Sequence, residues 1–200
     1  MKQLDQAINI LKQGGVVVYP TDTAYGLAVD ATNVTAVKKL YALKGRDFKK
    51  PVHVIVPFGH HHTVVYDSED ANRLMKKFWP GPLTIILPLK ARGKAWQILS
   101  AGTKTLGIRY PDNSTAQALV EALKNPITTT SANISGFNNC YSIAEVQRQF
   151  RYVPGYVPIF YLDGGKLPKT KPSTVVAISK NNVKILRVGP ISETEIKKVI

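Results

Sequence analysis

Along most of its length, this 200-residue chain alternates amphipathic helical stripes with short, continuously apolar segments. Apolar residues at spacings of three and four predict helices, whereas short apolar runs rich in Val, Ile and Thr predict strands. Helical stripes occupy residues 4–11, 34–41, 71–78, 116–123 and 196–200, and Ser142 marks the start of a further helix. Strands are predicted at residues 16–19, 52–56, 83–87, 106–109, 127–130, 174–178 and 183–186.

The order of these segments predicts an α/β fold. Strands that are apolar throughout are typical of sheets covered by helices on both faces. Residues 179–182, between the last two strands, predict a hairpin turn. We therefore expect a single domain over residues 1–200, built on an open, twisted, mixed sheet with helices on both faces. The Pro-rich segment 151–172 is predicted to be a long loop with a short strand at 157–161, and such loops often cover binding sites.

The composition limits which partners the chain can bind and which compartment it suits. The formal net charge of +14 attracts anions such as nucleotides, RNA or an acidic protein, although a basic surface can also serve solubility alone. Cys140 is the single cysteine, which excludes an internal disulfide and fits a reducing compartment. No apolar run is long enough to cross a membrane, so we expect a soluble, cytoplasmic protein with no membrane association.

The tripeptide Lys44-Gly45-Arg46 closes the second predicted helix. Lys44 follows Leu40 by four residues and Val37 by seven, so it lies on the apolar face, in the last turn. A cation in that place is directed toward the sheet and is suited to hold an anion. The alternative is that it only complements the helix dipole.

A polar segment, Thr128 to Asn133, closes a predicted strand. If the strand persists to its end, Thr129, Ser131 and Asn133 share one face and can donate to phosphate oxygens or to an amino acid. The alternative is a threonine ladder on a surface strand.

The predicted strand before Pro111 also carries polar residues on one face. Thr105, Gly107 and Arg109 alternate along it, so Gly107 would let a ligand approach the backbone and Arg109 suits a carboxylate. His53 lies in an apolar run, where a histidine is more often a satisfied core residue. The three histidines at 60–62 are assigned no metal role, because consecutive histidines after a glycine are typical of a solvated turn.

No catalytic triad and no pair of acid and base carboxylates stands out among the 13 acidic residues. The chemistry that this inventory favours is therefore the alignment of anionic groups. A reaction at phosphorus suits it, since positioning and charge neutralisation supply most of the catalysis there.

Taken together, the motifs resemble the YrdC-like threonylcarbamoyl-AMP synthases. The matching segments are, in order, GVVVYPTDTAYGL after Gly14, LKGRDFKKP, WPGPLTIIL, GIRYPD, TTSANISG, PSTVV and ILRVGPI. They span the chain almost end to end. The resemblance implies an open, twisted α/β sheet around a central basic cavity.

The resemblance further implies that the chain condenses L-threonine, bicarbonate and ATP to L-threonylcarbamoyl-AMP and pyrophosphate. In the family, the threonine amine is carboxylated and the carbamate oxygen attacks the α-phosphorus. A separate transferase then modifies the tRNA adenosine next to the anticodon. Mg²⁺ is expected with ATP, although the sequence shows no dedicated carboxylate site for it.

Site residues follow from the same resemblance. The family's Lys-x-Arg and Ser-x-Asn signature implies a catalytic set that clamps the ATP phosphates and the adenylated intermediate: Lys44, Arg46, Ser131 and Asn133. The implied ATP contacts are Arg46, Lys50, Thr105, Ser131 and Arg187. The implied threonine contacts are Thr23, His53, Arg109, Thr129 and Ser173, with Arg109 taking the carboxylate.

Two other functions stay open at this point. One is a basic module that binds double-stranded RNA or assists RNA or ribosome maturation, and the other is a paralogue with a changed substrate. The expected partners are the tRNA threonylcarbamoyl transferase machinery, met transiently, and RNA on the basic surface. The chain stops about ten residues past the Arg187 motif, as in single-domain members, so segment 151–172 is the expected lid.

Overall fold

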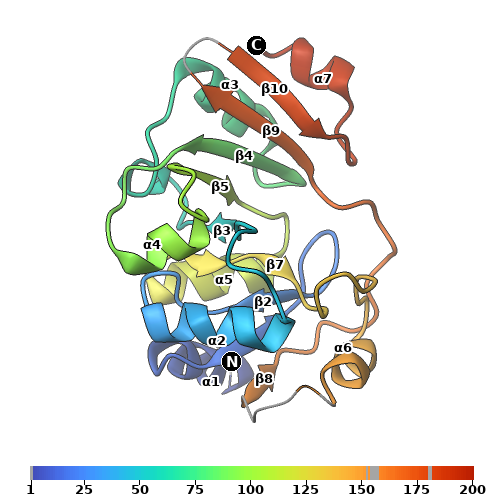
Figure 1. Cartoon of the computed structure of the whole chain (residues 1–200). Coiled ribbons are helices and arrows are strands. Elements are labelled where there is room, and N and C mark those ends of the chain that lie inside the picture. The colour runs from blue at the N-terminus through green and yellow to red at the C-terminus, as the bar shows by residue number, and fades with distance from the viewer. Residues whose placement is uncertain (1, 152, 154–157, 180–181) are drawn as a thin grey trace.

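The structure, a computed structural model, describes residues 2–151, 153, 158–179 and 182–200 (Figure 1). The strands are β1 (Val16–Tyr19), β2 (Gly26–Ala28), β3 (Val54–Ile55), β4 (Leu83–Pro88), β5 (Thr105–Arg109), β6 (Ile127–Thr128), β7 (Thr130–Ser131), β8 (Ile159–Tyr161), β9 (Thr174–Ser179) and β10 (Asn182–Arg187). The helices are α1 (Lys2–Lys12), α2 (Val34–Lys44), the short 3-10 helix η1 (His61–Thr63), α3 (Glu69–Phe78), α4 (Lys94–Leu99), α5 (Ser114–Leu123), α6 (Ile143–Phe150) and α7 (Glu193–Lys197).

The strands form two sheets where the sequence predicted one. The small sheet has the order β7-β2-β1-β8, and the large sheet has the order β10-β9-β4-β5-β3-β6. Both contain parallel and antiparallel pairs, so the predicted α/β class with open, mixed sheets is confirmed.

The predicted strand 127–130 explains the division. It breaks at Thr129: β6 pairs with β3 in the large sheet, and β7 pairs with β2 in the small sheet. The Thr129 N–H donates instead to the backbone oxygen of His53, at 2.8 Å. One predicted strand therefore links the two sheets.

Local capping explains where most helices begin. Side-chain oxygens accept backbone N–H groups at the starts of five helices, the capping residues being Asn33, Ser68, Asn113, Ser142 and Ser192. At the start of α7, Ser192 and Glu195 form a capping box, in which each side chain accepts the backbone N–H of the other residue. At α6 the Glu145 carboxylate accepts the N–H of Tyr141 at 2.6 Å, one residue before the cap. Gly45, with a φ of 54°, ends α2.

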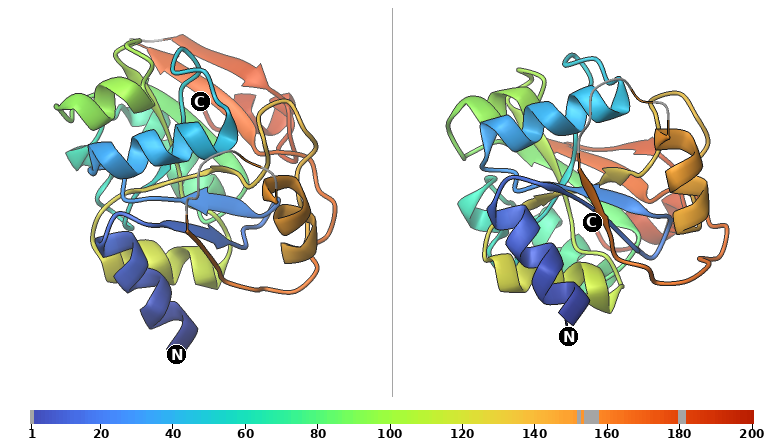
Figure 2. Two further views of the ribbon diagram at one scale, coloured as in Figure 1. Left: turned by 60° about the horizontal axis from the view of Figure 1, so that its bottom comes forward. Right: turned by 90° about the horizontal axis from the view of Figure 1, so that it is seen from below.

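Helices cover both faces of β1, as its unbroken apolar sequence predicted. Val16 and Val18 pack in a core cluster with residues of α2, whereas Val17 and Tyr19 pack with residues of α1 and α5. In Figure 2 (left), α2 and the pair α1 and α5 lie on opposite sides of the small sheet.

The large sheet is different, because one of its faces is polar. Leu106 and Ile108 of β5 belong to the core cluster that includes α3 and α4. On the other side of β5, Arg109 lines a cavity, as does Thr84 of β4. The expectation of helices on both faces is therefore wrong for this part of the large sheet, where the polar face is left open to form a site.

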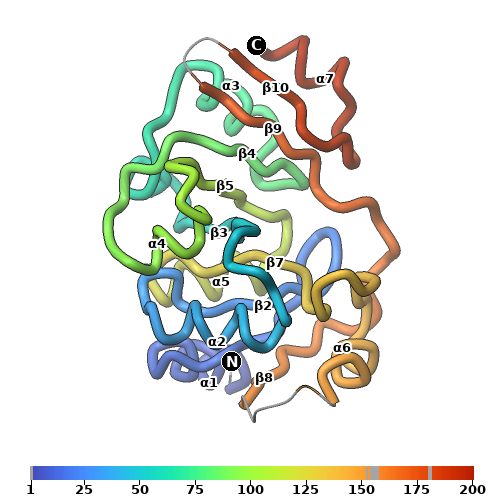
Figure 3. The backbone as a smooth tube through the Cα atoms, viewed as in Figure 1, coloured from blue at the N-terminus to red at the C-terminus, as the bar shows by residue number. Residues whose placement is uncertain are grey.

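The C-terminal part of the chain follows the predicted order. β9 and β10 pair antiparallel as expected for a hairpin, while residues 180–181 of the predicted turn lie outside the described residues. The predicted strand at 157–161 is present as β8, and the segment after it runs along the edge of the molecule up to β9 (Figure 3). No helix within the described ranges is long and apolar enough to cross a membrane.

Candidate active site

A cavity of about 460 Å³ is lined by segments of both sheets. Nine of the twelve predicted site residues line it, and they come from well-separated parts of the chain: Thr23, Arg46, Lys50, His53, Arg109, Thr129, Ser131, Ser173 and Arg187. Lys44, Thr105 and Asn133 are not among the lining residues. The structure therefore brings most of the predicted site together in one hollow.

The charge of this cavity is strongly positive. Four cationic side chains line it (Arg46, Lys50, Arg109 and Arg187), and no acidic residue does within the part of the chain that the structure describes. The Arg46 guanidinium donates to the backbone oxygens of Lys50, at 3.2 Å, and Pro51, at 2.7 Å. These bonds hold the loop after α2 at the cavity, so its cations are suited to bind phosphate groups.

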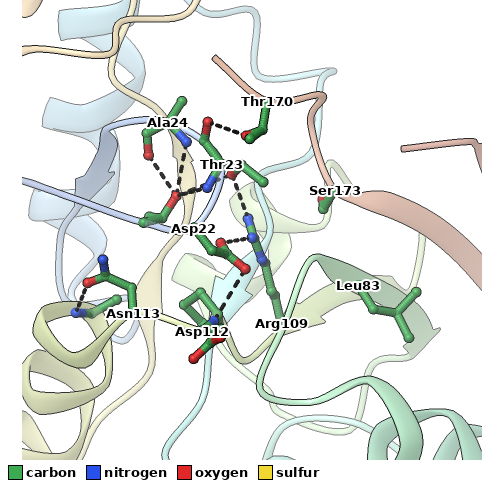
Figure 4. Close-up of polar contacts among 12 residues, drawn as sticks. Asp22, Thr23, Ala24, Leu83, Arg109, Asp112, Asn113, Thr170 and Ser173 are labelled. Carbon is green, nitrogen blue, oxygen red and sulfur yellow. Dashed lines mark hydrogen bonds and ion pairs between the residues drawn. The ribbon is translucent and has the colours of Figure 1, made fainter. Parts of the chain in front are cut away.

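Arg109 ends β5 and is buried, with only 6% of the residue exposed. Its guanidinium forms an ion pair with Asp22 and donates to the Thr23 hydroxyl at 3.2 Å (Figure 4). Its buried Nε atom has no hydrogen-bond partner among the described residues. A buried, partly unpaired guanidinium is suited to receive the carboxylate of a ligand.

A chain of polar contacts joins β4, β9 and β10 on the cavity wall. The Ser173 hydroxyl lies 2.9 Å from the Thr84 hydroxyl and accepts from Arg187 at 3.2 Å. Arg187 also donates from Nε to the Ser173 backbone oxygen at 2.9 Å. Burial, and then the charge of Arg109, lower the pKa of the Arg187 guanidinium. An anion in the cavity would relieve this repulsion.

His53 lies among these cations as a neutral ring. Burial lowers its pKa to about 4, and the charges of Arg187, Arg46 and Arg109 act in the same direction. A Cβ atom added at Gly107 would lie 2.4 Å from the ring carbon Cδ2 of His53. Gly107 thus makes room for this ring, and the expectation that a ligand approaches the backbone there is wrong because the ring fills that space.

Lys44 is buried beneath the site rather than exposed within it. Its side chain, 1% exposed, donates to the backbone oxygen of Ser131, to that of Asn133 at 2.6 Å, and to Asn133 Oδ1 at 3.1 Å. Burial, and then the charge of Arg46, lower its pKa to about 7. The prediction that Lys44 points toward the sheet holds, but its acceptors are protein oxygens, which satisfy the three N–H bonds of an ammonium group.

Asn133 is also fully engaged within the protein. Its Oδ1 atom accepts from Ser131 Oγ at 2.6 Å, and its Nδ2 atom donates to the Phe137 backbone oxygen at 2.5 Å. The predicted shared face of Thr129, Ser131 and Asn133 is therefore wrong in part. The strand ends at Ser131, so Thr129 and Ser131 line the cavity while Asn133 lies behind it.

Thr105 stands at the opposite end of β5 from Arg109. It pairs with Pro88, and its hydroxyl lies 3.1 Å from that of Thr103. Arg109 lies four positions further along the strand, a span of about 13 Å. Its role as an ATP contact stays a prediction.

Sequence reasoning assigned no role to five residues with polar side chains that line the cavity: Thr21, Tyr25, Thr84, Thr130 and Asn139. Asn139 lies in an irregular loop that carried no pattern. Asp22 forms the ion pair with Arg109, 87 residues away in the sequence, so only the fold brings the two together.

The described part of segment 151–172, the expected lid, contacts the site. Thr170 Oγ1 donates to the Thr23 backbone oxygen at 3.0 Å, and Pro172 lines the cavity. Residues 152 and 154–157 of this segment lie outside the described residues, and its closure on substrate stays a prediction. No group of three His, Cys, Asp or Glu side chains in the described ranges could hold a metal ion.

Known proteins share this fold and this sequence pattern. A family model for Sua5, YciO and YrdC, described as "Telomere recombination", matches residues 9–189. The threonylcarbamoyl-AMP synthase of Bacillus subtilis is 36% identical over 201 residues and that of Pyrococcus abyssi 33% over 196, covering 99% and 97% of this chain. The chain spans 56% of the length of each of these relatives.

Solved structures of similar proteins have the same fold. That of P. abyssi Sua5 complexed with L-threonine has a TM-score of 0.89 at 32% identity, covering 98% of this chain and 57% of that one. The crystal structure of E. coli YciO has a TM-score of 0.83 at 27% identity, covering 98% of this chain and 93% of that one. Since the family model spans nearly all of the sequence, the chain belongs to the Sua5/YciO/YrdC family.

Proposed function

We propose that this chain is a threonylcarbamoyl-AMP synthase, which condenses L-threonine, bicarbonate and ATP to L-threonylcarbamoyl-AMP and pyrophosphate. The observation that carries the proposal is one cavity in which four cations, a neutral imidazole and several hydroxyls converge. Two relatives bearing that name support it, at 36% and 33% identity. A nucleotidyl transfer of this kind needs alignment and charge neutralisation, which such a cavity supplies.

The residues divide between two tasks in this proposal. Arg109 holds the threonine carboxylate, and the hydroxyls of Thr23, Thr129 and Ser173 read its amine and side chain. Arg46, Lys50 and Arg187 hold the phosphates, so that the carbamate oxygen attacks the α-phosphorus and pyrophosphate leaves. Lys44 and Asn133 act indirectly, because their bonds fix Ser131 at the cavity.

The neutrality of His53 suits the binding of threonine. An imidazole whose pKa is about 4 carries no charge near pH 7, so it adds no repulsion for the threonine ammonium group. It can accept a hydrogen bond from that group at neutral pH.

The proposal includes Mg²⁺ carried on the phosphate oxygens of ATP, which is how this ion usually enters nucleotide sites. The residues fit that arrangement, because the cavity offers donors for the phosphates rather than a cage of carboxylates. When bound, the ion would neutralise charge on the leaving pyrophosphate. We also propose a single YrdC-like domain in the cytoplasm that passes its product to the tRNA threonylcarbamoyl transferase.

The test is pyrophosphate release from ATP that depends on both threonine and bicarbonate. Arg46→Gln should lower this turnover about 100-fold, because it removes a phosphate-binding cation from the cavity. Lys38→Gln, on the exposed side of α2, is the matched control and should keep activity within about twofold. Release that does not depend on threonine, or equal activity of the two variants, would reject the proposal. Threonine-independent binding of double-stranded RNA with a steep salt dependence would favour the RNA-binding alternative.

A further inference from the structure

Asp22 is the one acidic residue, among those that the structure describes, in an ion pair with a cation of the cavity wall. Its side chain is 12% exposed and that of Arg109 is 7% exposed, so water screens this pair weakly. Arg46, Lys50 and Arg187 have no such carboxylate partner among the described ion pairs. The cavity is therefore uneven in charge.

Asp22 is held in place from two sides. One carboxylate oxygen pairs with Arg109, and the other accepts the backbone N–H of Asp112 at 3.3 Å (Figure 4). Asp22 itself is not among the residues that line the cavity. It therefore acts on a ligand through Arg109, by fixing the guanidinium and by compensating its charge.

Arg109 differs from the other cations of the cavity wall in its surroundings. Its positive charge and the negative charge of Asp22 nearly cancel. Of its five N–H bonds, one goes to Asp22 and one to Thr23, which leaves three without an acceptor among the described residues. Such a group suits a zwitterion, which has no net charge but needs its carboxylate bound.

The other three cations have the opposite preference. Arg46, Lys50 and Arg187 carry three positive charges that no carboxylate in the described part of the chain neutralises. The Arg187 side chain is moreover bound to the neutral Ser173. Cations of this kind suit a polyanion such as a triphosphate, whose charge would exceed what the Arg109–Asp22 pair can hold.

We propose that Asp22 is the positioning residue that sorts the two substrates, by keeping phosphate groups off Arg109 and leaving this guanidinium to the amino acid. The inference rests on the proposed function and names the determinant of where each substrate binds. Without Asp22, Arg109 becomes a fourth uncompensated cation. Phosphate can then bind to Arg109 as well, so that phosphate and the amino acid compete for the same guanidinium.

The test replaces the charge of Asp22 and keeps its shape. In the wild-type protein, inorganic phosphate should inhibit competitively against ATP but not against threonine. In Asp22→Asn, phosphate should become competitive against threonine as well, and the ratio of threonine affinity to phosphate affinity, from calorimetric titration, should fall about tenfold. A purely structural role would lower both affinities without changing the mode of inhibition.

Two controls complete the experiment. Asp112→Asn removes an exposed carboxylate that does not pair with Arg109, and it should leave the inhibition pattern unchanged. The double variant Asp22→Asn/Arg109→Met should lose the new competition between phosphate and threonine, because the uncompensated cation is gone. Thermal melting of each variant shows that it is folded.

The outcomes separate the inference from the proposed function. A wild-type protein that binds neither threonine nor ATP would reject the function. A wild-type protein that binds both, with a folded Asp22→Asn variant whose phosphate inhibition stays noncompetitive against threonine, would overturn the role of Asp22 alone.

Discussion

At the scale of single residues, burial gives the two basic side chains Lys44 and His53 different roles. Burial lowers the pKa of both side chains, but Lys44 donates to three protein oxygens, which partly offset the cost of burying its ammonium group. His53 has cations around it, which add to the effect of burial and favour its neutral form. Lys44 therefore supports the segment after β6, whereas His53 offers an uncharged ring to the ligand.

The role of Lys44 predicts a loss of stability when it is replaced. Lys44→Met keeps most of the buried volume but removes three hydrogen bonds, and it leaves the Asn133 backbone oxygen without the donor that Lys44 supplies. We expect the free energy of unfolding to fall by about 2–3 kcal/mol in urea titrations, together with a loss of turnover. The exposed Lys38→Met, on the same helix, should change it by less than about 0.5 kcal/mol. Equal stability of both variants would contradict this structural role of Lys44.

At the scale of elements, local signals predict helices better than sheet partners. α1, α2, α3 and α5 appear where their apolar stripes predicted them, because caps and periodicity are local. α7 begins three residues before its predicted stripe and ends at Lys197. α4, which has six residues and no side-chain cap at Gly93, carried too little pattern to be found. β2, with three residues, is too short to stand out in the sequence.

Pairing between strands lies beyond this kind of reasoning. The sequence predicts one strand at 127–130, but its two halves find partners in different sheets, near residues 54 and 27. That choice depends on contacts between distant segments, which no local pattern encodes. The polar face of β5, by contrast, is predicted from the sequence, because alternation along one strand is a local pattern.

On the polar face of β5, Gly107 packs against the His53 ring. Gly107→Ala would place a Cβ atom 2.4 Å from the His53 ring, so the ring must move out of its position. We expect the KM for threonine to rise about tenfold, with a smaller change in the KM for ATP. In a His53→Ala background the same Gly107→Ala change should have little further effect, because the obstructing ring is absent. A full additional effect in that background would show that Gly107 acts independently of His53.

At the scale of the whole molecule, the two sheets enclose a site that neither could form alone. Nine of the twelve residues implied by the family resemblance line one cavity, although they come from segments spread between residues 23 and 187. Their identity could be predicted from the motifs. The arrangement could not, because it depends on the break at Thr129 and on the pairing of Asp22 with Arg109.

In the proposed function, Arg109 with its Asp22 partner receives the amino acid, and Arg46, Lys50 and Arg187 receive the phosphates. The proposed reaction requires both ligands in the hollow at once, with the α-phosphorus beside the threonine amine.

A crystal structure with L-threonine and a non-hydrolysable ATP analogue tests this account most directly. It should show the threonine carboxylate on the Arg109 guanidinium, with Asp22 still paired, and the analogue's phosphates on Arg46, Lys50 and Arg187. Phosphates bound to Arg109, or threonine bound outside the cavity between the two sheets, would contradict it.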